Sequence, residues 1–174
     1  EAEAAAAEQA AAAPSINPDQ QAHLKKLIDA TIYDKLVANG GIVPDGEGNV
    51  VEFRVYKGYW LLEDDEREQL TFDIVHLKSL PNLTEINLWD TDVTGNIESL
   101  KSLPNLTWIQ FDNTGVTGNI EHLKSLAKLT EINLCYTNVS GDIAHLVSLP
   151  KLTKIHLWDT FVSGNIAHLK SLLN

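Results

Sequence analysis

The chain has 174 residues, a formal net charge of -11 and 44% hydrophobic residues. That hydrophobic fraction suffices for one folded domain and excludes a disordered acidic polymer. The negative charge argues against nucleic acid, because there is no basic surface to displace counterions from phosphates, and against an anionic membrane surface. No apolar run approaches the length of a membrane span.

The alanine-rich segment 1–16 has high helix propensity but would fray alone in water. Its first four residues, Glu-Ala-Glu-Ala, resemble the remnant of a trimmed yeast secretion leader, so part of the segment is expected to be an expression scar. The same resemblance favours an extracellular, secreted protein. Cys135 is the single cysteine, so no disulfide can form within the chain.

Residues 17–49 are predicted to form an N-terminal helical cap. Asn17 suits an N-cap, and Pro18 suits the first helical position. One helix with a single apolar stripe is expected to end at Asn39, Gly40 and Gly41. The stripe consists of Leu24, Leu27, Ile28, Thr31 and Ile32. Residues 44–49 are predicted to be a turn.

Residues 50–76 are predicted to form a degenerate first repeat with an insertion. Val50, Phe53 and Val55 fit a strand, whereas residues 56–71 exceed the matching stretch of later repeats. Within the insertion, residues 60–62 are expected to cover the first coil. The acidic run 63–66 lacks the spaced oxygen ligands and glycine of an EF-hand loop, so a solvated charge run is favoured over a calcium site.

Residues 77–174 repeat with a step of 23 positions, as in Leu77, Leu100, Leu123, Leu146 and Leu169. Further columns keep the same step, including one that begins at Ile86 and one at Gly95. The unit reads L-x-x-L-x-x-L-x-x-I-x-L-x-x-T-x-V-x-G-x-I-x-x. Alternation around Ile86 and Leu88 predicts a strand, and the three-residue leucine spacing predicts a tight helical or extended return. Its apolar positions can be buried only by stacking neighbouring units.

This unit resembles the leucine-rich repeat of plant-type and protist proteins. The resemblance covers about residues 72–174 and, more faintly, 50–71. It implies an α/β solenoid with a parallel β-sheet on its concave face. The chain departs from the family where threonine replaces the usual asparagine, at Thr91, Thr114, Thr137 and Thr160. We expect these side chains to point inward and to form a ladder of hydrogen bonds to backbone between turns.

Candidate ligand-binding side chains lie on the predicted concave face. Large aromatic residues on a solvent-facing strand are not needed by the core, so their combination with amides and carboxylates favours a binding surface. The alternative is that tryptophan packs over its neighbours and stiffens the sheet. The candidates are Glu85, Asn87, Trp89, Asp90, Trp108, Gln110, Asp112, Tyr136, His156, Trp158 and Asp159.

These patterns predict a non-enzymatic recognition module for an extracellular protein or glycan, because no nucleophile has a base beside it and no two carboxylates face across a cleft. No cofactor or metal is expected. The column His76, His122, His145 and His168 has the spacing of a shared zinc or copper site, but a tolerated convex polar position is favoured.

Two alternative functions remain open. The chain stops at 169–174 as a further repeat would begin, so an uncovered last coil predicts either truncation or a homo-oligomer through the C-terminal edge. The repeated Thr94-Gly95-Asn96 motif puts a hydroxyl on every coil, as an ice-binding face would, although turn chemistry explains it more simply. Asn82, Asn105 and Asn138 begin N-glycosylation sequons.

Overall fold

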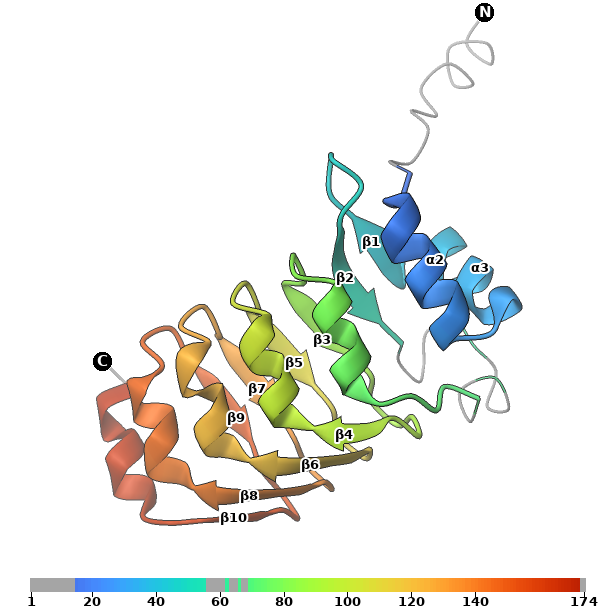
Figure 1. Cartoon of the computed structure of the whole chain (residues 1–174). Coiled ribbons are helices and arrows are strands. Elements are labelled where there is room, and N and C mark those ends of the chain that lie inside the picture. The colour runs from blue at the N-terminus through green and yellow to red at the C-terminus, as the bar shows by residue number, and fades with distance from the viewer. Residues whose placement is uncertain (1–14, 56–61, 63–65, 67–68, 173–174) are drawn as a thin grey trace, which may run out of the picture.

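The computed structural model describes residues 15–55, 62, 66 and 69–172, with side chains described up to 170. It is a stack of similar coils, with the two α-helices at one end and the C-terminus at the other (Figure 1). Among the described residues, no helix has the length and apolar character needed to cross a bilayer.

The N-terminal region begins with two helices, α2 (Pro18–Leu27) and α3 (Ala30–Ala38). Asn17 caps α2 as predicted, since its Oδ1 accepts hydrogen bonds from the backbone of Asp19 and Gln20. The single helix predicted across this region is wrong. Ile28 is extended, and Asp29 Oδ1 accepts a hydrogen bond from Thr31 N at 2.7 Å. Asp29 therefore caps α3 and separates it from α2.

A hairpin joins these helices to the coils. Strand β1 (Ile42–Pro44), which the sequence did not predict, pairs antiparallel with β2 (Val50–Arg54). The predicted strand at β2 is confirmed, and it pairs parallel with the next coil. Gln20 of α2 is buried and its Oε1 accepts from Val50 N at 2.7 Å, which ties the helix to this strand. The division into segments 1–16, 17–49, 50–76 and 77–174 stays a prediction.

Each later coil contributes one strand to each of two sheets. The first sheet has the order β1-β2-β3-β5-β7-β9, where the last four are β3 (Glu85–Asn87), β5 (Trp108–Gln110), β7 (Glu131–Asn133) and β9 (Lys154–His156). Glu85 pairs with Trp108, Trp108 with Glu131, and Glu131 with Lys154, so equivalent repeat positions lie side by side. The second sheet is parallel throughout and contains β4 (Thr94–Asn96), β6 (Gly115–Asn119), β8 (Asn138–Asp142) and β10 (Phe161–Ser163).

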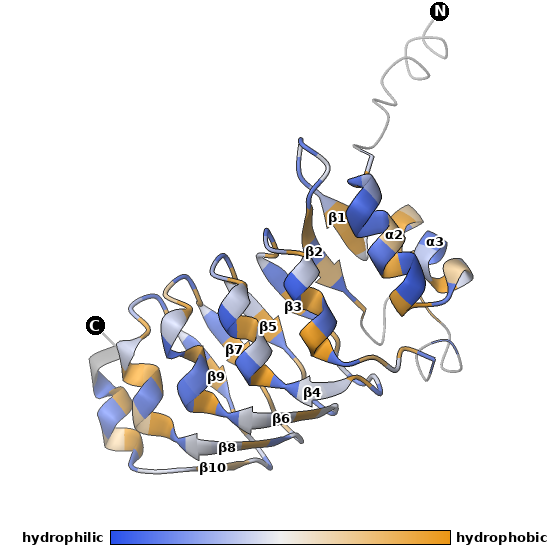
Figure 2. Cartoon of the chain, in the orientation of Figure 1, coloured by the Kyte–Doolittle hydropathy of each residue, from blue (hydrophilic) through white to orange (hydrophobic). Residues whose placement is uncertain are grey.

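Short 3₁₀ helices close each coil, as the three-residue leucine spacing indicated. They are η1 (Ile74–Ser79), η2 (Ile97–Ser102), η3 (Ile120–Ser125), η4 (Ile143–Ser148) and η5 (Ile166–Leu172). Their apolar side chains join those of both sheets in one continuous core, to which the orange segments in Figure 2 contribute. Leu77, Leu100 and Leu146 are fully buried.

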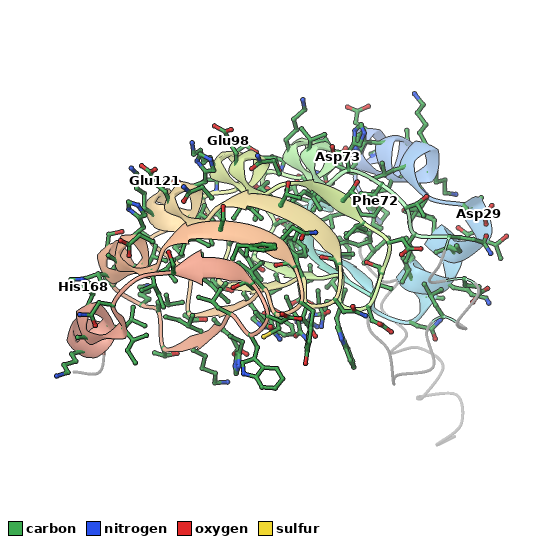
Figure 3. All side chains as sticks on the ribbon, turned by 90° about the horizontal axis from the view of Figure 1, so that it is seen from below. Asp29, Phe72, Asp73, Glu98, Glu121 and His168 are labelled. Atoms are coloured by element: carbon green, nitrogen blue, oxygen red, sulfur yellow. The ribbon has the colours of Figure 1, made fainter. Side chains whose placement is uncertain are left out.

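The glycine and the asparagine of the repeated turn fit together between coils. Asn96 Oδ1 caps η2 by accepting from Glu98 N at 2.8 Å. Gly118 of the next coil has φ 116°, and a Cβ there would lie 2.3 Å from that same oxygen. The glycine is therefore required both by its backbone conformation and by the capping side chain beneath it. Figure 3 shows the row of capped helices along Asp73, Glu98 and Glu121.

The threonine column at Thr91, Thr114 and Thr137 is buried, as expected, but the predicted bonds between turns are wrong. Thr114 Oγ1 donates to Phe111 O at 2.6 Å, three residues earlier in its own coil. The ladder between coils exists in a different column, at Thr84, Thr107, Thr130 and Thr153. Thr107 Oγ1, for example, donates to Thr84 O at 3.0 Å.

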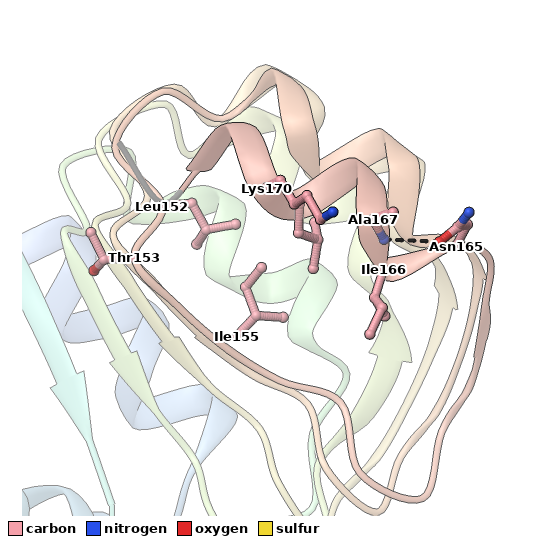
Figure 4. A pocket seen from close by; sticks show the side chains of 8 residues that line it. Leu152, Thr153, Ile155, Asn165, Ile166, Ala167 and Lys170 are labelled. Atoms are coloured by element: carbon pink, nitrogen blue, oxygen red, sulfur yellow. Dashed lines mark hydrogen bonds between the residues drawn. The ribbon is translucent and has the colours of Figure 1, made fainter.

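The last coil is less covered than the others. Ile166 is 72% exposed, and an apolar hollow of about 570 Å³ opens beside it, lined mainly by Leu152, Ile155, Ala167 and Leu169 (Figure 4). Within the insertion, Leu62 packs against the core, and Lys35 Nζ contacts Glu66 Oε1. The rest of the predicted insertion lies outside the described residues. This applies to Trp60 and Leu61, which were expected to cover the first coil, and to residues 63–65 of the acidic run.

Candidate recognition site at the strand exits

The first column of the concave face is occupied by ion pairs within the molecule. Arg54 contacts Glu52 Oε2 at 2.8 Å and also Glu85 Oε2. Lys154 Nζ contacts Glu131 Oε2 at 3.0 Å. Trp108 lies between these pairs, half-buried, and its Nε1 is buried with no hydrogen-bond partner among the described residues. The carboxylates of this column are already neutralised by ion pairs within the molecule, so the column is less suited to a polar ligand.

The second column shows one correction. Asn87 was expected on the accessible face, but it is only 3% exposed. Its Oδ1 accepts from Trp89 N at 3.1 Å and its Nδ2 donates to Gln110 Oε1 at 3.4 Å, so it holds the neighbouring backbone and side chain. Gln110 is half-buried, and His156 on the last strand is exposed.

Four of the eleven predicted site residues meet where the strands end. Trp89, Asp90, Asp112, Asn113 and Tyr136 line a hollow of about 450 Å³ that spans three coils. Asn113 Nδ2 donates to Asp90 Oδ1 at 2.6 Å, which joins the first two coils. Asn113 was not among the predicted ligand contacts, although it shares the repeat position of Asp90 and Tyr136. That shared column was the available signal.

The backbone at this column turns in a conformation that few side chains favour. Asp90, Asn113, Tyr136 and Asp159 have φ between 53° and 57°. Aspartate and asparagine tolerate this left-handed region because their short polar side chains bond locally, whereas a bulky side chain is a strained exception. Tyr136 is that exception, and the residue is 49% exposed. Nothing in the coil geometry requires an aromatic residue there.

The electrostatics of the hollow centre on Asp112. Burial raises the pKa of the Asp112 carboxyl above its ordinary 3.8, and the charge of Asp90 adds to the rise. Hydrogen bonding with Gln110 and the charge of His156 oppose it. Asn133 Nδ2 also donates to Asp112 Oδ1 at 3.2 Å. The carboxylate is thus surrounded by amides, a nearby acid and a more distant histidine.

The last coil extends the aromatic part of this surface. Trp158 is 74% exposed, and its ring meets that of Tyr136 edge to face with centroids 6.1 Å apart. Cys135 lies beneath, with its Sγ 3.2 Å from Trp158 N. Asp159 is exposed at the end of the same strand. Trp158 and Asp159 therefore continue the line from Trp89 through Tyr136.

The histidine column lies on the 3₁₀ helices η1, η3, η4 and η5. No group of three or more histidine, cysteine, aspartate or glutamate side chains in the described part of the chain could hold a metal ion. His76 instead faces His23 of α2, whose Nε2 lies 3.1 Å from His76 O. A polar position on the convex side stays the preferred interpretation of this column.

No family model matches the chain, and no curated protein matches it either. Solved structures do. The coils superpose on a plant ice-binding protein with a TM-score of 0.67 at 21% identity, over 84% of this chain and 50% of that one. The BIR2 ectodomain from Arabidopsis thaliana gives a TM-score of 0.58 at 20% identity, over 75% of this chain and 67% of that one.

A third similar structure has higher identity. A plant peptide hormone receptor, RGFR1, solved in complex with RGF2, gives a TM-score of 0.53 at 29% identity, over 59% of this chain and 17% of the receptor. These neighbours are leucine-rich-repeat proteins, and the parallel strands found here fit the same solenoid fold. The chain has the leucine-rich-repeat fold. This leucine-rich-repeat chain spans half or less of the ice-binding protein and of the receptor.

Proposed function

We propose that this leucine-rich-repeat protein is a non-enzymatic recognition module that binds an extracellular protein or glycan at the strand-exit hollow. The observation that carries the proposal is Tyr136, an aromatic residue held at φ 54° on the wall of a hollow that also contains Trp89 and two carboxylates. Backbone strain of this kind clusters at active sites and ligand-binding sites. The hollow and the exposed Trp158 form one continuous surface.

The neighbouring surfaces support this placement. The first column of the concave face already neutralises Glu85 and Glu131 with Arg54 and Lys154. The hollow, in contrast, combines rings with amides and carboxylates, a mixture that suits stacked sugars or a protein loop. RGFR1 is a plant peptide hormone receptor in complex with RGF2, which favours a peptide or protein ligand on a scaffold of this kind.

The test is ligand capture by the whole chain with matched variants. The immobilised protein is exposed to a glycan array and to an extracellular protein extract. Trp89→Ala and Tyr136→Asn are expected to lose the captured ligand while unfolding cooperatively. Phe161→Ala is the control, because Phe161 is an aromatic residue that is 69% exposed on the second sheet, away from the hollow. Equal capture by all four proteins would reject the site.

A second candidate is ice binding by the second sheet. The parallel strands β4, β6, β8 and β10 carry one hydroxyl per coil, at Thr94, Thr117, Ser140 and Ser163, and the chain resembles a plant ice-binding protein in fold. The Oδ1 atoms of Asn96 and Asn119 are already hydrogen-bonded as helix caps, so they are less available to ice than the hydroxyls. Inhibition of ice recrystallisation that Thr117→Lys abolishes would support this function, and inactive wild-type protein would remove it.

A third candidate is a homo-oligomer formed through the C-terminal edge. The apolar hollow beside Ile166 and Leu169 gives a second copy a surface to cover. Concentration-dependent sedimentation of the wild type, with Ile166→Glu remaining monomeric, would support it. A wild-type monomer at all concentrations would reject it.

A further inference from the structure

The strand-exit hollow has the chemistry of a site for an organic cation. Two of the five residues that line it, Asp90 and Asp112, carry carboxylates, and the other three are Trp89, Asn113 and Tyr136. The lysine and arginine pairs on the same face go to other carboxylates: Arg54 to Glu52 and Glu85, and Lys154 to Glu131. The net charge of -11 adds a long-range field that favours a positive ligand.

The aromatic walls supply a second, independent reason. A cation over the face of tryptophan or tyrosine, within about 6 Å of the ring centre, is attracted by the ring quadrupole. Trp89 and Tyr136 come from coils two repeats apart and line the same hollow as Asp112 from the coil between them. A planar cation entering there meets rings and a carboxylate at once.

The immediate partners of Asp112 leave a role for such a charge. Asn133 Nδ2 donates to its Oδ1, and Gln110 is also hydrogen-bonded to it, so these partners are neutral amides. A guanidinium is planar, stacks on aromatic faces and bonds a carboxylate through two parallel N–H groups. An ammonium group offers neither the plane nor the paired donors.

We propose that the hollow binds an arginine side chain of a protein ligand, with the guanidinium hydrogen-bonded to Asp112 and stacked against Trp89 or Tyr136. This inference rests on the proposed function and deepens it, because it selects a protein over a neutral glycan. Asp90 and its hydrogen-bonded partner Asn113 complete the rim. The remainder of the ligand would extend over Trp158 on the last coil.

The experiment is an NMR titration of the full ¹⁵N-labelled chain with acetyl-Gly-Arg-Gly amide at physiological salt. The matched probe carries citrulline, which keeps the shape of arginine but is neutral. We expect the arginine peptide to shift the indole N–H of Trp89 and the backbone N–H groups of Asp112 and Tyr136. The citrulline peptide is expected to cause no saturable shift.

Variants separate a specific site from general attraction to an acidic protein. Asp112→Asn preserves shape and should weaken the arginine peptide about tenfold or more, as expected for loss of a charge-assisted bond. Glu98→Gln removes the same charge from the exposed side of η2 and should leave affinity within about twofold. Equal weakening in both variants, equal response to citrulline, or shifts spread over the whole acidic surface would overturn the proposal.

Failure here is distinguishable from failure of the proposed function. If neutral oligosaccharides shift Trp89 and the arginine peptide does not, the hollow is a recognition site and the arginine assignment is wrong. If a captured ligand still depends on Trp89 and Tyr136 while the arginine peptide does not bind, the same conclusion holds. If neither the peptide nor any captured ligand depends on these residues, both proposals fall.

Discussion

Replacing Tyr136 with asparagine tests whether the strand-exit column trades stability for binding. The equivalent positions of the other coils carry Asp90, Asn113 and Asp159, and all four residues share φ near 55°. Asparagine therefore restores the side-chain type that the coil geometry favours. We expect Tyr136→Asn to abolish ligand capture while leaving the protein folded.

The change in stability is the sum of two opposing effects. The left-handed conformation costs an ordinary L-residue about 1–2 kcal/mol, and asparagine avoids part of that cost. The edge-to-face contact between Tyr136 and Trp158, whose centroids lie 6.1 Å apart, contributes about 0.5–1.5 kcal/mol in the opposite direction. The single variant should therefore unfold within about 1 kcal/mol of the wild type.

A double-mutant cycle separates the two effects. In a Trp158→Ala background the ring contact is already absent, so adding Tyr136→Asn should raise the free energy of unfolding by about 1 kcal/mol in urea denaturation. The reciprocal change, Asn113→Tyr, should lower it by about 1–2 kcal/mol, because it adds strain and removes the bond to Asp90. If Tyr136→Asn destabilises the Trp158→Ala protein, the tyrosine is not strained and its backbone conformation does not mark a binding site.

Three further predictions concern the fold and the charge of the hollow. Gly118→Ala should lower the free energy of unfolding by more than about 2 kcal/mol in urea denaturation, because φ of Gly118 is 116° and the new Cβ would lie 2.3 Å from Asn96 Oδ1. Gly46→Ala is the control, because a Cβ at Gly46 has no atom within 4 Å. An equal loss in both variants would contradict the packing of Gly118 against Asn96. Thr107→Val should lower the free energy of unfolding by about 1 kcal/mol, because it breaks the hydrogen bond to Thr84 O. Thr114→Val should lower it more, because Phe111 O loses its partner within the buried coil. A smaller loss for Thr114→Val would contradict the distinction between a bond within a coil and a bond between coils. Burial raises the pKa of Asp112 above 3.8, so its ionised form destabilises the folded protein at neutral pH, and this penalty vanishes as the pH falls below 3.8. Asp112→Asn should therefore raise the melting temperature at pH 7 but not at about pH 3. A higher melting temperature that persists at acid pH would exclude the titration of Asp112 as its cause.

Much of the coil could be predicted because stacking copies the same constraint into every repeat. Leucine, isoleucine and valine columns keep their step only if each coil buries them against the next, so Ile86, Leu88 and Leu77 indicated a strand and a tight return. The glycine column was also readable, since Gly95 and its equivalents have φ near 114°. A periodic pattern of this kind reports on burial directly.

Features decided by single hydrogen bonds could not be predicted from the pattern. Asp29 ends one helix and begins another, although the apolar stripe continues past it. Two threonine columns look alike in the sequence, and only the placement of their hydroxyls shows that Thr107 bonds between coils and Thr114 within one. A hydroxyl donor has too many local acceptors for spacing to select one.

The candidate site was predicted in part. Alternation placed Trp89 and Asp112 on the concave face, and Asp90 and Tyr136 were expected at the strand exits beside them. These four candidates line one hollow together with Asn113. Alternation also placed Asn87 on the concave face. Strand alternation cannot predict that the Asn87 side chain accepts a hydrogen bond from the backbone N–H of Trp89, two residues later. The repeat position that Asn113 shares with Asp90 and Tyr136 indicated that it lies at the rim, but repeat spacing did not reveal the left-handed backbone at that position.

Hydrogen–deuterium exchange of the whole protein with a captured ligand tests the placement of the recognition site most directly. Binding at the hollow predicts slowed exchange in residues 88–91, 111–114 and 134–137, with little change in the second sheet at 94–96, 115–119 and 138–142. Protection confined to that second sheet, or to residues 152–170 at the open end, would show that the ligand binds elsewhere.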